Sequence, residues 1–473
     1  MSPLKASSLK SNFIYKSLLT VSNYLVSFII FPYVSRVLDV ENIGLVNFVD
    51  NTINYFVLFA MMGINVLGVR EIARVKDLPQ ERSRIFSNIL GVNILFALPT
   101  IILFTILVYS IPNLHPYSEL LYVGASKILF STLLVEWFFT GMEDFKYITI
   151  RSLVIKLLYL ISVVVLVKNE GDYKTYFYLT LSTTIVNALV NIIHAGKFVR
   201  IKICDLFNTC YLKQNLTLGV YSIMTSMYIT FNVMYLGLAS DNTQVGYYTS
   251  AFKLYSVILG IFTAFTTVML PRMSSLWAGK EKESFTQLIR KSFSLMTLFC
   301  CPLVICSIIM APQMIYVLSG PGYDGAIIPM RIIMPGIICV CISQVLAMQI
   351  LVPLKRDKVL LYTSIAGALL SVVLNLALVS RFHCVGSAVV LLSSELLVTV
   401  IYLFVVRFCT DIHLPWNRLV VSVLLSVPSA IICIFVPRLM TGYIYMSFFV
   451  TLVIALAVWT VLAYMVRRYF IIS

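Results

Sequence analysis

Polar side chains recur at helical spacing inside four strongly apolar stretches of this chain. In residues 44–68, Asn47, Asn51, Asn54 and Asn65 follow steps that place them on one helix face. Residues 11–35, 214–238 and 246–270 carry similar stripes, made of Lys16, Thr20, Asn23 and Ser27; of Tyr221, Thr225, Tyr228, Asn232 and Tyr235; and of Thr249, Lys253, Ser256, Thr263 and Thr267. We interpret the stripes as the lining of a hydrated cavity between two halves of the protein. The alternative is that small polar residues simply hold membrane helices together.

Charged side chains also lie inside apolar stretches, where a charge at the centre of a lone helix costs at least ~2.5–3.5 kcal/mol. They are Asp50, Lys127, Glu136, Lys156, Lys253 and Glu395, with Arg36 and Arg331 near the ends of stretches. Lys253 lies about seven residues, or ~10 Å, inside its stretch and on the polar stripe. It is therefore our principal ligand candidate, and snorkelling of its ammonium group to the interface is the alternative.

The remaining intramembrane charges predict ion pairs or ion coupling. Lys127 and Glu136 are nine residues apart, which places them on opposite faces of a helix. We expect Lys127 to meet an acid on another helix, Glu136 to lie near the interface, and Lys156 to have a structural partner. Asp50 adjoins the polar stripe and is our candidate for an acid linked to an ion gradient. The group assigned to an intramembrane charge network or to ion coupling is Asp50, Lys127, Glu136, Lys156, Arg331 and Glu395.

The sequence lacks the motifs of soluble and metal-dependent enzymes. It has no Gly-x-x-x-x-Gly-Lys loop, no Gly-x-Ser-x-Gly elbow, no Cys-x-x-Cys pair among ten cysteines and no His-Glu-x-x-His among four histidines. We expect no enzymatic activity, no catalytic residue, no metal site and no cofactor. Any uphill work would then use an H⁺ or Na⁺ gradient, a partner or the substrate itself.

The elements that position these residues are transmembrane helices. Hydrophobic residues make up 60% of the 473-residue chain and charged residues 12%, which excludes soluble domains. About 14 apolar stretches approach or exceed the ~20 residues that a helix needs to cross a bilayer. They lie near 11–35, 44–68, 85–110, 118–140, 147–167, 173–195, 214–238, 246–270, 292–318, 327–352, 358–379, 384–406, 417–436 and 441–466. We predict an all-α integral membrane protein.

The linkers between the stretches carry an uneven charge. With the N-terminus inside, alternate linkers and the two termini hold 25 Lys and Arg residues, among them Arg82, Arg151 and Arg418, against five on the opposite side. Short loops rich in Lys and Arg stay in the cytoplasm, so both termini are predicted to be cytoplasmic. The net charge of +15 is explained by loops that face anionic lipid and does not require nucleic acid.

An internal repeat appears when the sequence is shifted by 202 residues. Gly44 then aligns with Gly246, Arg70 with Arg272, and the first two stretches with the seventh and eighth. Repeated halves around a midplane site are a common transporter plan. We predict residues 1–195 as a first lobe, 196–213 as a cytoplasmic linker, 214–407 as a second lobe and 408–473 as a terminal helix pair.

Several runs of residues also match a known family. They are 12–15 (Asn-Phe-Ile-Tyr), 31–38 (Phe-Pro-Tyr-Val-Ser-Arg-Val-Leu), 44–48 (Gly-Leu-Val-Asn-Phe), 54–56 (Asn-Tyr-Phe), 68–73 (Gly-Val-Arg-Glu-Ile-Ala) and the block 136–151. These runs resemble Wzx-type O-antigen flippases, in the polysaccharide-transporter branch of the multidrug/oligosaccharidyl-lipid/polysaccharide superfamily. Leu38-Asp39-Val40-Glu41 departs from the family, because a Gly-Pro pair is expected in this turn.

The resemblance implies two six-helix lobes in an inverted V, a central cavity that alternates its opening, and a C-terminal helix pair. It also implies that the cargo is a polyprenyl-pyrophosphate-linked oligosaccharide, moved to the outer leaflet of a bacterial inner membrane. The protein would then contact membrane lipids and, as further partners, a polysaccharide polymerase and chain-length proteins. Lys253 and Arg36 would supply cations for the pyrophosphate, and Tyr221, Tyr228 and Asn54 would stack on or hydrogen-bond the sugars. Asn51 and Asn232 complete the set of candidate substrate-binding residues in the cavity.

Two other functions stay open. A multidrug or organic-cation antiporter of the same superfamily would share the fold, but it should have acidic cavity residues, whereas this stripe carries Lys253 and amides. A membrane glycosyltransferase or polymerase would normally need a sizeable outer loop with catalytic carboxylates, and the predicted outer loops are very short.

Overall fold

The computed structural model describes residues 9–206, 210–226, 230–440 and 442–471, and within them it contains helices and no strand. The chain forms two compact units, Met1–Thr243 and Gln244–Ser473. Helices of the first unit are α1 (Leu9–Met61), α2 (Ile64–Val75), α3 (Pro79–Ser110), η1 (Pro112–Tyr117), α4 (Ser118–Leu133), α5 (Glu136–Gly141), α6 (Phe145–Leu166), η2 (Glu170–Asp172), α7 (Tyr173–Ala195), α8 (Ile203–Leu206), α9 (Leu212–Ser226) and α10 (Asn232–Ala239).

The second unit begins inside α11 (Asn242–Ala278). Its other helices are α12 (Lys282–Ile309), α13 (Ala311–Ser319), η4 (Asp324–Ala326), α14 (Ile327–Ile333), α15 (Gly336–Gln344), the π-helical η5 (Val345–Leu351), α16 (Asp357–Leu374), the π-helical η6 (Asn375–Val379), α17 (Ser380–Cys409), α18 (Trp416–Leu439) and α19 (Ile444–Ile471).

The distribution of side chains on α6 is that of a helix in lipid. Val154, Leu157 and Ile161 are at least half exposed, while Arg151 and Ser152 are buried. In water this arrangement would expose apolar surface and bury polar groups, whereas in a bilayer the solvent is itself apolar. The prediction of an all-α membrane fold is thus confirmed.

Eleven helical segments in the described residues are long and apolar enough to cross a membrane. One of them, Asp357–Cys409, contains two expected spans, because the helix is interrupted at His383 (φ 48°, ψ −126°). The predicted number of about 14 spans therefore stays a prediction.

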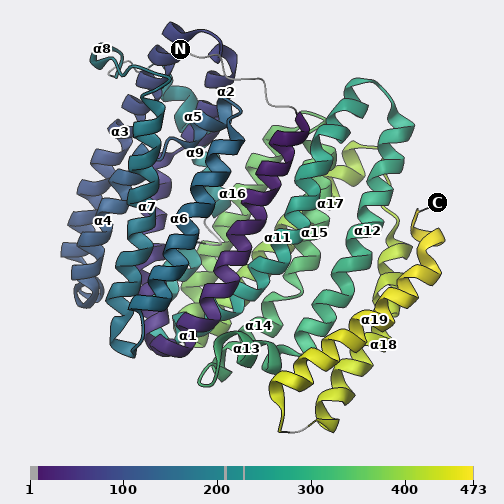
Figure 1. The fold of residues 1–473 in the computed structure, drawn as a ribbon. Coiled ribbons are helices and arrows are strands. Elements are labelled where there is room, and N and C mark those ends of the chain that lie inside the picture. Colours follow the sequence, from purple (N-terminus) through teal and green to yellow (C-terminus); the bar gives the residue numbers. More distant parts are fainter. Residues whose placement is uncertain (1–8, 207–209, 227–229, 441, 472–473) are drawn as a thin grey trace. The chain divides into compact units, whose positions relative to one another are not determined.

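A similar interruption divides α1 at Asp39, where φ is 67° and ψ is 167°. Figure 1 shows the two halves of α1 meeting at a reversal of the chain. Glycine alone adopts this backbone conformation without steric cost. Asp39 occupies the turn in which the resemblance led us to expect a Gly-Pro pair, so the family's turn is retained with a residue that strains it.

The repeat seen in the sequence also appears in the helix boundaries. The break at Asp39 in α1 corresponds, 202 residues later, to Asp241 between α10 and α11. Likewise α3 begins at Pro79, and α12 begins one residue beyond the corresponding position. The two halves differ at Met62 and Gly63, where the first is interrupted while α11 continues.

Two segments of the family resemblance pack against each other in the first unit. Gly68 of α2 faces the indole of Trp137 of α5, and a Cβ at Gly68 would lie only 2.5 Å from that ring. Gly141 of α5 similarly faces Ile72 of α2. Trp137 is 2% exposed and belongs to an aromatic core that includes Phe86 and Phe138. The small residues thus let the two helices cross closely.

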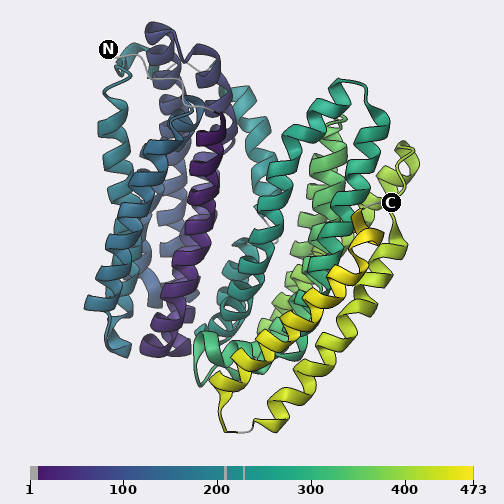
Figure 2. The same ribbon diagram turned by 45° about the vertical axis from the view of Figure 1, so that its right-hand side comes forward.

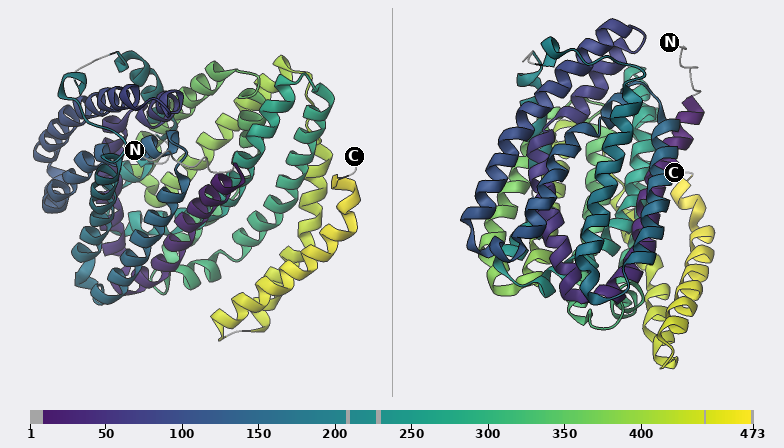
Figure 3. Two further views of the ribbon diagram at one scale, coloured as in Figure 1. Left: turned by 45° about the horizontal axis from the view of Figure 1, so that its top comes forward. Right: turned by 60° about the vertical axis from the view of Figure 1, so that its left-hand side comes forward.

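The predicted division of the chain at 1–195, 196–213, 214–407 and 408–473 stays a prediction. The compact units divide instead after Thr243, since α9 and α10 pack on α1 and α2. In the second unit α18 packs on α12, and α19 lies beside α18 (Figure 2). Figure 3 shows the pair α18 and α19, the segments nearest the C-terminus in the colour scale, from two further sides. The expected terminal helix pair is therefore in contact with the rest of its unit.

Replacing Asp39 by glycine should raise the thermal stability of the protein. Removing a strained φ of 67° should outweigh the added flexibility of the unfolded chain, with a net gain of about 1 kcal/mol. The measurement is thermal unfolding of the purified protein in detergent. Glu41→Gly, two residues further along the same helix, is the control and should lower stability. An unfolding temperature of Asp39→Gly below that of the wild type would contradict the assignment of strain.

Candidate functional site

An ion pair joins the second half of α1 to α4. Lys127 Nζ lies 2.5 Å from Asp50 Oδ1, and the two side chains are 13% and 24% exposed. Asn54 Nδ2 donates to the other carboxylate oxygen of Asp50 at 2.9 Å. The expectation that Lys127 meets an acid on another helix is confirmed, and that acid is the predicted gradient-linked Asp50.

The amides of the α1 stripe are partly satisfied by their own helix. Asn47 Nδ2 donates to Ile43 O and Asn51 Nδ2 to Asn47 O, at 2.8 and 2.9 Å. The side chains of Asn51 and Asn54 remain partly exposed. Asn54 additionally orients Asp50 through its amide nitrogen.

A second cluster is centred on Arg151, which links α5, α6 and α7. Its Nη2 lies 2.6 Å from Glu136 Oε1 and 3.0 Å from Ser152 Oγ, and its Nη1 donates to Asn191 Oδ1. Asn191 is fully buried and donates in turn to Leu134 O. Arg151 therefore fixes three helices at one point through charge-assisted hydrogen bonds.

This cluster corrects part of the sequence interpretation. Arg151 was assigned to the cationic loops, yet it lies inside α6 and is 6% exposed. The signal was present, because Arg151 falls within the predicted span 147–167. Glu136 was expected at the interface; its side chain is indeed 49% exposed, but it is held by Arg151. Asn191 was missed, since an asparagine in a span has no distinguishing pattern.

Two further loop cations are also buried. Arg82 donates to Lys76 O and Phe198 O, which ties the start of α3 to the segment after α7. Arg418 of α18 donates to Ser294 Oγ of α12 at 2.6 Å. These cations therefore hold helix ends in place.

Lys156 connects α6 to the first half of α1. Its ammonium group donates to Ser22 Oγ at 2.9 Å and to Asn23 Oδ1. Asn23 belongs to the predicted stripe and is exposed. Lys156 thus has the structural partners that were expected, and both are uncharged.

The polar residues of the stripe on α11 have two kinds of surroundings. Lys253 and Ser256 are partly exposed. Thr263, further along, accepts a hydrogen bond from Gln344 Nε2 at 2.9 Å, and Thr266 donates to Gln344 Oε1 at 2.8 Å. Around Thr263 the polar groups join α11 to α15, which is the role of polar residues as links between helices.

Glu395 of α17 is the buried acid of the second unit. It is 7% exposed, and within the described residues its carboxylate forms no hydrogen bond and no ion pair. Arg331, which we grouped with it, is exposed and donates to Ile308 O at 3.3 Å.

The other predicted site residues differ in their surroundings. Arg36 is exposed and donates to Pro32 O. Asn232 is fully buried in α10. Tyr228 and the side chain of Tyr221 lie outside the described residues. The role of these residues in ligand binding stays a prediction, as does the cavity lined by all four stripes.

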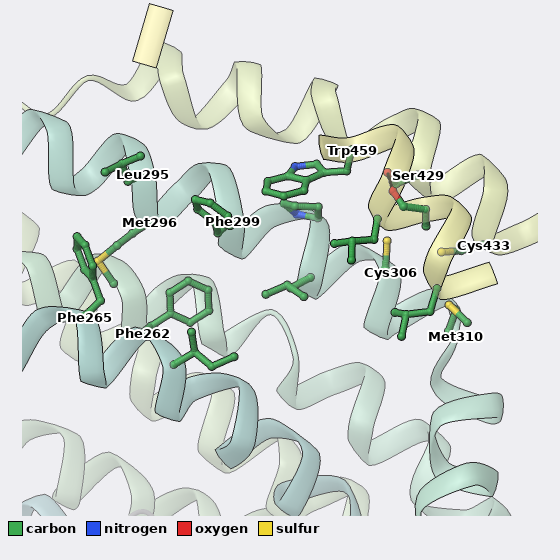
Figure 4. A pocket seen from close by; sticks show the side chains of 16 residues that line it. Phe262, Phe265, Leu295, Met296, Phe299, Cys306, Met310, Ser429, Cys433 and Trp459 are labelled. Atoms are coloured by element: carbon green, nitrogen blue, oxygen red, sulfur yellow. Dashed lines mark hydrogen bonds between the residues drawn. The ribbon is translucent and has the colours of Figure 1, made fainter. Parts of the chain in front are cut away.

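An apolar groove lies within the second unit, between α11, α12, α18 and α19. Its volume is about 480 Å³, and Figure 4 shows Phe262, Phe299 and Trp459 among the side chains that border it. Ser429 and the thiols of Cys306 and Cys433 are its few polar groups. Such a surface suits a long hydrocarbon chain. The sequence interpretation did not foresee this groove, because its walls come from helices far apart in the chain.

Comparison with protein families gives two matches. The family model described as polysaccharide biosynthesis protein matches residues 9–277, and the MatE model matches residues 217–377. A relative from Escherichia coli (strain K12) is 27% identical over 407 residues, which are 85% of this chain and 97% of the relative. A relative from Shigella dysenteriae is 24% identical over 409 residues, which are 84% of this chain and 100% of the relative. Both carry the name "Putative O-antigen transporter".

Solved structures with similar folds include the lipid II flippase MurJ in an inward closed conformation. Its TM-score is 0.77 at 15% sequence identity, over 96% of this chain and 99% of that one. An inward-facing multidrug resistance MATE family transporter of the MOP superfamily gives 0.62 at 16% identity, over 84% and 98% of the two chains. These likenesses establish the fold.

In the Arg151 cluster the arginine is buried while its partner Glu136 is half exposed, and this difference leads to a prediction. Arg151→Ala removes the buried partner and leaves Asn191 and Glu136 without it, at a cost of about 2–3 kcal/mol, since Glu136 keeps part of its hydration. Glu136→Gln should cost less, because the amide still accepts from Arg151. Thermal unfolding and abundance in membranes are the measurements.

Lys146→Ala is the matched control, because Lys146 is an exposed cation one and a half turns earlier on the same helix. It should behave like the wild type. Equal losses for Lys146→Ala and Arg151→Ala would show that Arg151 acts only as a topogenic charge.

Proposed function

Because this chain belongs to the polysaccharide biosynthesis protein family, we propose that it is a flippase for polyprenyl-pyrophosphate-linked oligosaccharides. The cargo would be the repeat unit of an O-antigen, a capsule or an exopolysaccharide. It would pass from the cytoplasmic to the outer leaflet of a bacterial inner membrane by alternating access.

One observation carries the proposal. The membrane-spanning helices of this fold contain cationic and amide side chains, and the protein also has a separate apolar groove. Lys156 and Asn54 are such polar groups in the first unit, and the groove of about 480 Å³ lies in the second. A lipid-linked glycan needs both, because its head is anionic and hydroxylated while its tail is a long hydrocarbon. The groove gives the tail an apolar surface beside the bilayer.

We propose that the head group of the cargo is bound by the candidate residues identified in the sequence. Lys253 and Arg36 would bind the pyrophosphate, whose charge needs cationic partners inside the membrane. Asn51, Asn54, Asn232, Tyr221 and Tyr228 would hydrogen-bond or stack on sugars. The two relatives named as O-antigen transporters support a glycan as cargo.

An ion gradient is a suitable energy source. Asp50 and Glu395 are the acids that we assign to coupling, with Glu395 the better placed, because Asp50 is already neutralised by Lys127. Export that continues unchanged when the H⁺ and Na⁺ gradients are collapsed would remove ion coupling from the proposal.

The MatE match and the MATE-like fold favour a multidrug antiporter as the second candidate. An organic cation needs an unpaired acid in its path. In the first unit the two acids that we assigned to the charge network, Asp50 and Glu136, are bound to Lys127 and Arg151. The first unit therefore favours an anionic cargo, and the acid that an antiporter would have to use is Glu395 of the second unit. An enzyme such as a membrane glycosyltransferase is set aside, since both named relatives are transporters.

Orientation can be tested separately from transport. We expect probes at Lys76, Lys282 and Ser473 to report the cytoplasm, and probes at Asn113, Asp241 and Asp324 the outside, because loops rich in Lys and Arg stay inside. Single-cysteine labelling in a background without the ten native cysteines measures this. An external signal at Lys282 would overturn the orientation of the second half.

Substitution of Lys253 tests the transport proposal. Lys253→Ala should reduce cargo affinity roughly ten- to hundredfold, the effect of losing a charge-assisted hydrogen bond worth ~1.5–3 kcal/mol. Lys253→Arg should keep part of the activity, and Lys253→Glu should be worst because it repels an anion. The measurement is glycan export in a flippase-deficient strain, with membrane abundance determined in parallel.

Lys282→Ala is the control, because Lys282 is an exposed cation at the start of α12. It should export normally. Normal export by a Lys253→Glu protein of normal abundance would eliminate the anion-binding role of Lys253.

A further inference from the structure

Lys156 lies near the middle of a membrane-spanning helix. It follows Phe145, the first residue of α6, by 11 residues and precedes the last, Leu166, by 10. At 1.5 Å per residue these steps are about 16 and 15 Å. A lysine side chain is too short to bring its ammonium group to either interface from this depth, so snorkelling does not explain it.

The two contacts of Lys156 are to neutral oxygen atoms, those of Ser22 and Asn23. An ammonium group has three N–H donors, so one remains for another acceptor. The first 38 residues of the chain contain no Asp or Glu, so the first half of α1 can supply no acid to it.

The two acids that we assigned to the charge network of this unit already have partners. Asp50 is bound by Lys127 and Glu136 by Arg151, each as a one-to-one pair. Glu136 is the acid that acts on Lys156 through space, and Arg151 opposes it. Asp50, Lys127, Glu136, Arg151 and Lys156 together therefore carry one positive charge in excess. An ion pair would have lowered the cost of placing the partly buried Lys156 inside the membrane, and among the described residues it forms none.

We propose that Lys156, with Ser22 and Asn23, forms an anion-binding subsite for the diphosphate of the cargo as it crosses the middle of the membrane. This inference rests on the proposed flippase function and adds a site in the first unit to the one assigned to Lys253. The free N–H of Lys156 and its uncompensated charge would meet a phosphate oxygen. Asn23, exposed on the stripe, would donate through its amide nitrogen.

A structural role and an anion-binding role of Lys156 predict different effects of its replacement on thermal stability. If Lys156 serves to join α6 to α1 through its hydrogen bonds, replacing it by methionine should destabilise the protein. If it is kept for an anion, Lys156→Met removes a partly buried intramembrane charge while preserving the length of the side chain. Its thermal stability should then equal or exceed that of the wild type, although binding is lost.

The decisive experiment measures binding to the full chain in lipid nanodiscs. Farnesyl diphosphate is the probe, and farnesol is its uncharged counterpart. We expect the wild type to prefer the diphosphate, Lys156→Met to lose roughly ten- to hundredfold in diphosphate affinity, and farnesol binding to be unchanged. Lys156→Arg should retain part of the preference. Lys168→Met, at an exposed position two residues beyond α6, is the control and should bind like the wild type.

The outcomes distinguish a failure of the proposed flippase function from a failure of the Lys156 subsite alone. A wild type that binds farnesyl diphosphate no better than farnesol would contradict the proposed function. A wild type that discriminates, together with a Lys156→Met variant that discriminates equally well, would overturn only the subsite. A Lys156→Met variant with a clearly lowered unfolding temperature would assign Lys156 to helix packing and overturn it as well.

Discussion

A charge packed between helices inside a bilayer loses most of its hydration, and this constraint organises the first unit. Each intramembrane charge must find a partner on another helix, so each pairing also fixes two helices against one another. The Asp50–Lys127 pair joins α1 to α4, and Lys156 joins α6 to α1 through its hydrogen bond to Ser22. Arg151 holds α5, α6 and α7 together. The hydrophobic effect selects which residues enter the membrane, but lipid and core are equally apolar. Polar contacts therefore contribute specificity to the order of the helices.

The same constraint sets the limit of what the sequence can predict. Hydropathy is a local property of the sequence, and it predicted the all-α membrane fold. Helical geometry also excluded a Lys127–Glu136 pair, which the structure confirms by giving each a different partner. The identity of those partners depends on contacts between distant segments, and no periodicity contains it. Arg151 was misassigned for this reason, because a cation near the end of a span looks the same whether it faces water or Asn191.

The turns of the two halves illustrate how a family pattern and a particular sequence combine. The break at Asp39 requires the backbone conformation that glycine favours, and the residue present pays a steric penalty to adopt it. Its counterpart near Asp241 lies between two separate helices, and there the chain needs no such conformation. A repeat can therefore keep the position of a turn while changing its geometry. The resemblance predicted where the chain would reverse, and the structure adds the strain.

The balance of charges also separates the two units. In the first unit the charge network pairs Asp50 and Glu136 and leaves Lys156 in excess. In the second unit Glu395 is buried, and its carboxylate forms no hydrogen bond or ion pair within the described residues. An excess cation attracts an anionic cargo, and a solitary acid attracts a proton or a metal cation. Were both functions placed in one cluster, the acid and the cation would neutralise each other and neither ligand would be bound strongly. Lys156 and Glu395 belong to different units, and each keeps the preference of its own charge, Lys156 for an anion and Glu395 for a proton or a cation.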